Sequence, residues 1–225
     1  MLHSTYYLKE TNEDSKTSAI FENLMLLPDN VFWHLLRQSS FSHETMPKLS
    51  GELLSYDFWP HWDRTGTDNK NYVEPDLFLR FESFDVIIEA KYGDYNGQYH
   101  HQWQQEITAY HNEYGYDKQF VFIAIGGNQS NVAETISVKS QKVKIYKCNW
   151  LSILMNINKY KKELEHLSTS IPDMNFSATL RLLRNIILAF NINGVYNIDW
   201  FNSMSQPKPI ISETSIDNFN KHYNW

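Results

Sequence analysis

The sequence has little cysteine, no long apolar run and no excess of positive charge, and each absence excludes a class of protein. One cysteine, Cys148, in 225 residues rules out an intramolecular disulfide and fits a reducing compartment. No window reaches the roughly 18 apolar residues of a membrane span, and residues 1–10 lack the apolar segment of a secretory signal. We therefore expect a cytoplasmic protein with no membrane partner.

The net charge of −6, from 26 acidic and 20 basic residues, argues against nucleic-acid binding through a broadly basic surface. It does not exclude a nucleic-acid enzyme, because a bound divalent cation reverses the local charge. The 42% hydrophobic and 20% charged content is typical of a globular protein. Since no repeat or low-complexity linker divides the chain, we expect one domain over residues 1–225, with a core at about 10–150 and a C-terminal helical extension at about 151–225.

Residues 71–91, NYVEPDLFLRFESFDVIIEAK, are the most informative stretch. Two runs rich in β-branched and aromatic residues, 75–81 and 84–91, flank the short polar step Glu82-Ser83, and this pattern predicts a β-hairpin. If the pairing is symmetric about that step, Leu77 pairs with Ile88 and Asp76 lies opposite Glu89. Directly opposed residues share one face of a sheet, so these two carboxylates are expected to lie close together.

Glu89 and Lys91 are two residues apart on the same predicted strand and therefore point to the same side. Opposed carboxylates repel each other unless a positive charge lies between them. A divalent cation meets this need, and Mg²⁺ typically takes one or two protein carboxylates and keeps several waters. Asp76 and Glu89 are candidate metal ligands with the main-chain carbonyl of Ala90 as a third oxygen, and Lys91 is a candidate for orienting or deprotonating a water. The alternative is a solvated face of an ordinary hairpin.

This arrangement resembles a known signature. Glu74-Pro75-Asp76, followed after twelve residues by Glu89-Ala90-Lys91 in an apolar strand, is similar to the motif of the PD-(D/E)XK nuclease superfamily. The resemblance implies a restriction-endonuclease-like α/β core, Mg²⁺ bound by Asp76 and Glu89, and Lys91 as the catalytic lysine.

The predicted helix over 98–114 extends the resemblance. Its glutamine-rich start, with Tyr110 further along, is similar to the helix that follows the lysine strand in RecB-like members. Those members often place Gln four residues before the Tyr, where this chain has Glu106, so Gln102 is the candidate for the equivalent role. Members also often contribute a Glu from the first helix. Glu13 projects close to the apolar stripe of that helix and Glu22 projects away from it, so Glu13 is the preferred candidate.

The remaining pattern predicts a mixed sheet with helices on its faces. Helices are expected at 11–27, 29–37, 149–167 and 179–190, and further strands at 53–59, 118–125 and 143–147. The order strand, strand, helix, strand, strand suggests a mixed central sheet. The predicted fold class is thus α/β, a restriction-endonuclease-like mixed central sheet flanked by helices, with C-terminal helices.

The function expected from the resemblance is hydrolysis of phosphodiester bonds in nucleic acid, most simply DNA, with Mg²⁺ as cofactor and Mn²⁺ as a substitute. Two alternatives stay open. The chain is a catalytically silent binding or assembly protein on the same fold, or it is a subunit that acts only in a homo-oligomer or with a partner protein.

Overall fold

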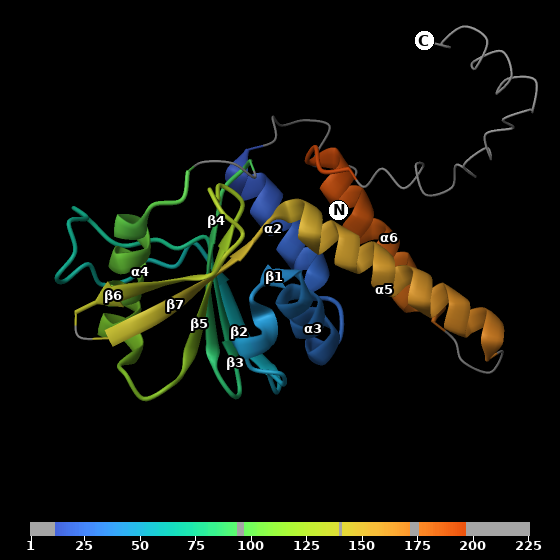
Figure 1. Ribbon diagram of the computed structural model, residues 1–225, viewed down its shortest axis with the longest axis horizontal. Helices are drawn as coiled ribbons and strands as arrows, with labels where there is room; N and C mark the ends of the chain where they lie inside the picture. Colours follow the sequence, from blue (N-terminus) through green and yellow to red (C-terminus); the bar gives the residue numbers. More distant parts are fainter. Residues whose placement is uncertain (1–11, 94–96, 140, 172–175, 197–225) are drawn as a thin grey trace, which may run out of the picture.

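A computed structural model of the chain describes residues 12–93, 97–139, 141–171 and 176–196. Its centre is a seven-stranded mixed sheet with the order β1-β7-β5-β4-β3-β2, in which β6 pairs with β7 (Figure 1). The pairs β4–β5 and β5–β7 are parallel and the other pairs are antiparallel. The elements are α2 (Glu13–Leu24), α3 (Asp29–Ser39), β1 (Ser40–Phe41), η1 (His43–Thr45), β2 (Leu53–Phe58), β3 (Leu77–Phe81), β4 (Asp85–Ala90), α4 (His100–Tyr114), β5 (Phe120–Ile125), β6 (Glu134–Val138), β7 (Gln141–Cys148), α5 (Trp150–Ser170) and α6 (Ser177–Ile192).

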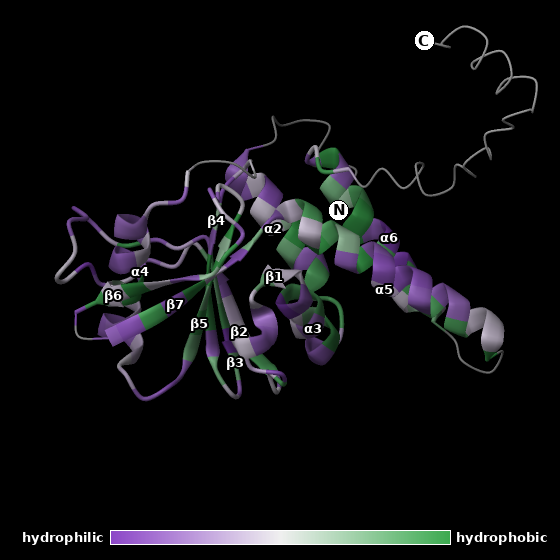
Figure 2. Cartoon of the chain, viewed as in Figure 1, coloured by the Kyte–Doolittle hydropathy of each residue, from purple (hydrophilic) through white to green (hydrophobic). Residues whose placement is uncertain are grey.

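Helices cover both faces of the sheet, which confirms the predicted α/β class. Helix α4 lies on one face, and α2, α3, α5 and α6 lie on the other (Figure 1). Each face has its own core of buried apolar side chains, one centred on Trp103 and Ile107 of α4 and one that includes Phe21, Trp33 and Trp150. In Figure 2 the distal half of α5 is mostly hydrophilic, in keeping with its distance from the sheet.

The hairpin of β3 and β4 forms in the predicted register. Leu77 pairs with Ile88 and Leu79 with Val86, and the Phe81 N–H donates to the Phe84 carbonyl at 3.0 Å. All six residues of β4 are buried, since helices cover both sides of the strand. Val86, Ile88 and Ala90 point toward one core, whereas Ile87 points toward α4. Because side chains alternate along a strand, Glu89 faces α4 as well.

The structure adds strands that the sequence pattern did not predict. β6 lies inside the polar stretch before residue 143, and the two-residue β1 pairs with the end of β7. Both are short and flank β7 on the edge away from β5, where alternation of a few apolar residues gives a weak signal. The helix predicted at 11–27 is shorter in the structure. The side chain of Asn12 accepts a hydrogen bond from the Ser15 N–H and caps its start, and the helix ends at Leu24 with Met25 as its C-cap. Predictions on residues 1–11 and 197–225 lie outside the described residues.

The C-terminal helices share the core of the sheet. Ile153 and Leu154 of α5 and Leu183 and Phe190 of α6 are buried in the same cluster as Phe21 of α2. Asn149 alone separates β7 from Trp150, the first residue of α5, so the helix starts at the carboxyl end of the parallel strands. Among the described residues, no helix has the length and apolar character needed to cross a membrane.

Candidate metal and catalytic site

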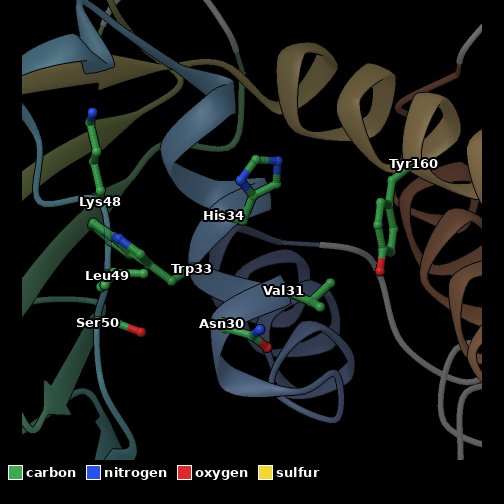
Figure 3. Close-up of a pocket in the computed structure, with 8 residues that line it drawn as sticks. All are labelled: Asn30, Val31, Trp33, His34, Lys48, Leu49, Ser50 and Tyr160. Atoms are coloured by element: carbon green, nitrogen blue, oxygen red, sulfur yellow. The ribbon is translucent and has the colours of Figure 1, made fainter.

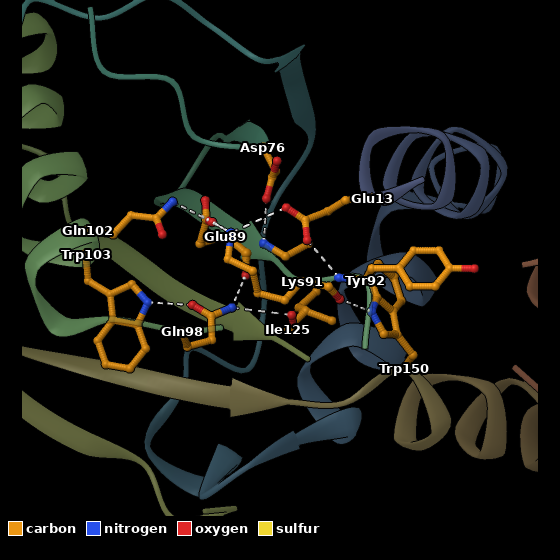
Figure 4. A network of polar contacts seen from close by, with 11 residues as sticks. Glu13, Asp76, Glu89, Lys91, Tyr92, Gln98, Gln102, Trp103, Ile125 and Trp150 are labelled. Carbon is orange, nitrogen blue, oxygen red and sulfur yellow. Dashed lines mark hydrogen bonds and ion pairs between the residues drawn. The ribbon is translucent and has the colours of Figure 1, made fainter. Parts of the chain in front are cut away.

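The predicted site residues meet at the carboxyl end of β4, beside the start of the antiparallel β3 (Figure 4). Asp76 directly precedes β3, and its Oδ2 accepts a hydrogen bond of 2.7 Å from the Ala90 N–H. This bond fixes the Asp76 carboxylate to the last residue of β4. The carboxyl edge of parallel strands is a common place for ligand sites in α/β folds.

Lys91 connects the carboxylates. Its Nζ forms a short hydrogen-bonded ion pair with Oε1 of Glu89 and lies 3.4 Å from Oε1 of Glu13. The other oxygen of Glu13 accepts the Tyr92 N–H at 2.8 Å. Helix α2 therefore brings a carboxylate to Lys91 from the opposite side of the sheet. Glu22, the other candidate on this helix, is exposed.

Helix α4 contributes an amide to the site. Nε2 of Gln102 donates to Oε1 of Glu89 at 2.6 Å, so Gln102 contacts the carboxylate proposed to bind metal. Gln98 lies just before the helix, where its side-chain amide donates to the Glu89 carbonyl at 3.0 Å and its oxygen accepts the Trp103 indole N–H at 2.7 Å. The sequence singled out Gln102 but not Gln98. The signal for it was its place next to Gly97, just before the predicted helix.

Glu106 is a second residue of the site that sequence reasoning left without a role. It is 1% exposed, as is Glu89, and in the described part of the chain its carboxyl oxygens have no hydrogen-bond donor as partner. Its polar neighbour is the Glu89 carboxyl, to which it is close enough to bond. Two carboxyl groups bond to each other only when one carries a proton. The signal for its location was its spacing, one turn from Gln102 and one turn from Tyr110.

The buried carboxyls favour their protonated forms. Burial, with the nearby Glu89 carboxylate, raises the pKa of Asp76 to about 8. Burial also raises the pKa of Glu89 and raises that of Glu106 well above its usual value. Burial lowers the pKa of Lys91, but the Glu89 and Glu13 carboxylates outweigh it and the net pKa lies above the usual value. The site therefore combines several carboxyls that favour their protonated forms with the charged ammonium of Lys91.

This donor set fits Mg²⁺ bound by few protein ligands. In the described ranges, no group of three or more His, Cys, Asp or Glu side chains is arranged to hold a metal ion. Asp76 and Glu89 supply two carboxylates, which matches the usual Mg²⁺ site with water in its remaining positions. A cation there would favour the deprotonated forms of Asp76 and Glu89, which burial otherwise disfavours. Ala90 is buried between them, and its carbonyl remains a predicted ligand.

In the hydrolysis of nucleic acid that the sequence resemblance leads us to expect, replacing Glu13 by glutamine should slow the reaction about tenfold, equivalent to about 1.4 kcal/mol of lost transition-state stabilisation. The amide keeps an acceptor for the Tyr92 N–H but removes the charge beside the Lys91 ammonium. The measurement is kcat at saturating Mg²⁺. Glu22→Gln, on the exposed side of the same helix, is the matched control, and equal rates for the two variants would show that Glu13 has no part in the site.

A pocket elsewhere on the molecule is separate from this site. It has a volume of about 340 Å³ and lies between α3, residues 48–50 and Tyr160 of α5 (Figure 3). Its lining is mostly apolar, with His34 and Lys48 at its walls. None of the predicted site residues lines it, so it does not bear on the chemistry at the end of β4.

Comparison with known proteins finds a similarity that extends over most of the chain. The chain is 29% identical over 202 residues to an uncharacterized protein of Pasteurella multocida (strain Pm70), and the match covers 86% of this chain and 75% of that protein. No protein-family model matches the chain.

Proposed function

We propose that the protein is a Mg²⁺-dependent nuclease of the PD-(D/E)XK type that hydrolyses phosphodiester bonds, with DNA as the expected substrate. The observation that carries this proposal is the convergence of Asp76, Glu89 and Lys91 at one end of the β3–β4 hairpin. Gln102 of α4 and Glu13 of α2 reach the same point from the two faces of the sheet. An ordinary solvated hairpin face does not explain this cluster, because Asp76 and Glu89 are 8% and 1% exposed.

Each residue has a separate task in this proposal. Asp76 and Glu89 would hold the metal, with the Ala90 carbonyl as the third ligand from the chain. When bound, Mg²⁺ supplies Lewis-acid stabilisation of the negative charge that grows on the phosphate. Gln102 orients the Glu89 carboxylate through its amide, and Glu13 orients Lys91. Mn²⁺ is expected to replace Mg²⁺, since both take oxygen ligands in octahedral geometry.

The raised pKa of Lys91 supports one of the two roles considered for it. An ammonium that holds its proton at neutral pH donates hydrogen bonds and does not act as a base. Lys91 is therefore assigned to orienting the attacking water and stabilising the developing charge. In the hydrolysis itself, the water oxygen bonds to phosphorus and gives up one proton to solvent as the bond to the leaving oxygen breaks, and the leaving oxygen takes up a proton from solvent.

The experiment that tests the function is a substrate and metal panel. Purified protein is incubated with linear DNA and with RNA in Mg²⁺, Mn²⁺ or EDTA, and the products are resolved on denaturing gels. We expect cutting of DNA in either metal and none in EDTA. Cutting of RNA alone would correct the substrate, whereas cutting of neither substrate would count against an isolated nuclease and favour a binding protein or a subunit that needs a partner.

Mg²⁺ binding is expected to release a proton and to tighten as pH rises. With its pKa at about 8, Asp76 is protonated at neutral pH without metal and must lose that proton to become a ligand. The apparent affinity should rise by up to about tenfold per pH unit below pH 8 and level off above it. Calorimetric titration in buffers of different ionisation enthalpy measures both quantities. Equal affinity at pH 6.5 and 8.5, with no proton release, would contradict a role for Asp76 as ligand.

A further inference from the structure

Lys91 follows the last residue of β4, at the point where the strand leaves the sheet. Its N–H still donates to the Ile125 carbonyl of β5 at 2.8 Å. Its carbonyl accepts the indole N–H of Trp150 at 2.7 Å, and Trp150 is fully buried. The main chain of Lys91 is thus held on one side by the sheet and on the other by the first residue of α5 (Figure 4).

Two side chains of helix α2 bond the main-chain N–H and carbonyl of the next residue, Tyr92. The Tyr92 N–H donates to Glu13, and the Tyr92 carbonyl accepts from Nζ of Lys16 at 2.7 Å. Lys16 is 3% exposed, and its Nζ lies 4.9 Å from the Tyr92 ring centre and 4.7 Å from that of Trp150. Glu13 and Lys16 are one turn apart, so the same face of α2 supplies both contacts.

The turn after β5 packs closely against the main chain of Lys91 and Gly93. Gly126 has a φ of +66°, and a Cβ built on it would lie 2.6 Å from the Lys91 carbonyl oxygen and 2.5 Å from that of Gly93. The Gly127 N–H donates to the same Gly93 carbonyl at 2.7 Å. Only a glycine permits this approach, since a side chain there would collide with main-chain atoms that cannot move aside.

We propose that Trp150 and Lys16 are positioning residues, which fix the main chain of residues 91–92 so that the Lys91 ammonium stays between Glu89 and Glu13. This inference rests on the proposed nuclease function and extends it to α5. The start of helix α5 is then part of the working site and not only of the core. Neither residue is assigned a contact with substrate; both act through Lys91.

The geometry explains why two contacts of this kind matter. A lysine side chain is long and flexible, so its ammonium keeps one position only if its main chain and its charged partners are both fixed. A displacement of about 1 Å at a reacting centre can cost on the order of 100-fold in rate. Loss of the Trp150 or Lys16 contact is therefore expected to act on the chemical step and not on substrate binding.

The test compares Trp150→Phe with Trp33→Phe. Each variant keeps an aromatic ring and loses one indole N–H bond to a main-chain carbonyl, since the Trp33 indole donates to Pro47 at 2.9 Å and is equally buried. We expect Trp150→Phe to lower kcat by roughly 10- to 100-fold with KM within about twofold, and Trp33→Phe to keep both. Equal kcat for the two variants at equal melting temperature would overturn the positioning role.

A second variant removes the other contact. Lys16→Met keeps the length of the side chain but cannot donate to the Tyr92 carbonyl, and it should also lower kcat. Lys118→Met is its control, because Nζ of Lys118 donates to the main-chain carbonyl of Phe81, the last residue of β3, at the opposite end of the β3–β4 hairpin. If both variants keep wild-type kcat, Lys16 does not position Lys91.

A readout without catalysis separates this inference from the proposed function. Amide hydrogen exchange at Tyr92 is expected to speed up in Trp150→Phe and Lys16→Met and to stay unchanged in Trp33→Phe. If the wild-type protein cuts no nucleic acid, the proposed function fails, and faster exchange at Tyr92 would still establish the structural contacts. If the wild type cuts and exchange at Tyr92 is unchanged in both variants, the function stands and the positioning role is wrong.

Discussion

Replacing Asp76 by asparagine is expected to remove Mg²⁺-dependent cleavage while it stabilises the metal-free protein at alkaline pH. The amide cannot replace the carboxylate as a charged metal ligand, so we expect the cleavage rate to fall by a factor of roughly 1,000. The amide oxygen still accepts the Ala90 N–H, so the hairpin is expected to fold as before. Loss of activity and gain of stability in one variant is a combination that simple misfolding does not produce.

The sign of the stability change follows from the pKa of Asp76. The folded protein holds the Asp76 proton up to about pH 8, whereas the unfolded chain releases it near the ordinary value of 3.8. Between these values the folded state binds more protons, so the free energy of unfolding falls as pH rises, by about 1.4 kcal/mol per unit from this group. In Asp76→Asn this group does not titrate, so the free energy of unfolding does not fall with pH on its account. The variant should therefore unfold at a higher temperature than the wild type at pH 9.

Melting curves in EDTA from pH 5 to 9 measure this effect. Asp57→Asn, on the exposed edge strand β2, is the matched control and should follow the wild type at every pH. An Asp76→Asn protein with the same pH dependence as the wild type would show that Asp76 is ionised in the metal-free state.

Replacing Lys91 by methionine is expected to lower the cleavage rate roughly 100- to 1,000-fold while Mg²⁺ still binds. Methionine keeps an unbranched apolar side chain of similar length but has no ammonium to orient water or to stabilise charge. Mg²⁺ affinity should rise, because the ammonium that pairs with Glu89 in the metal-free protein no longer competes. This variant therefore separates binding of the metal from the chemical step.

Lys118→Met is the matched control for this substitution. Lys118 pairs with Asp85 at 2.7 Å, at the other end of the same strand β4, and Asp85 is as buried as Glu89. Its loss is expected to lower stability and to leave the cleavage rate per folded molecule unchanged. If Lys91→Met binds Mg²⁺ and cuts at the wild-type rate, Lys91 is not catalytic.

The hairpin that carries the site was predictable, because the turn signal and the apolar patterns of the two strands indicate the same pairing. A short polar step between two apolar runs sets the register, and the register places Asp76 opposite Glu89. The carboxylate from α2 could also be predicted from the sequence, since helical periodicity places Glu13 and Glu22 on different sides of that helix. Only the fold, however, reveals that Glu13 reaches Lys91 across the end of the sheet.

Other parts of the site depend on contacts between distant segments, which periodicity does not encode. The burial of Glu106 against Glu89 requires the packing angle of α4 on the sheet. The bond from Trp150 to Lys91 joins residues 59 positions apart. β6 was missed for a related reason, because an edge strand with few apolar residues takes its structure from pairing with β7.

The measurement that tests the central claim most directly is a time course of cleavage of circular DNA by the wild-type protein and Lys91→Met, each in Mg²⁺ and in EDTA. We expect nicking or linearisation by the wild type in Mg²⁺ alone, and at least a roughly 100-fold slower reaction for Lys91→Met. Cleavage that persists in EDTA, or that proceeds at equal rates in the two proteins, would contradict a metal-dependent site built from Asp76, Glu89 and Lys91.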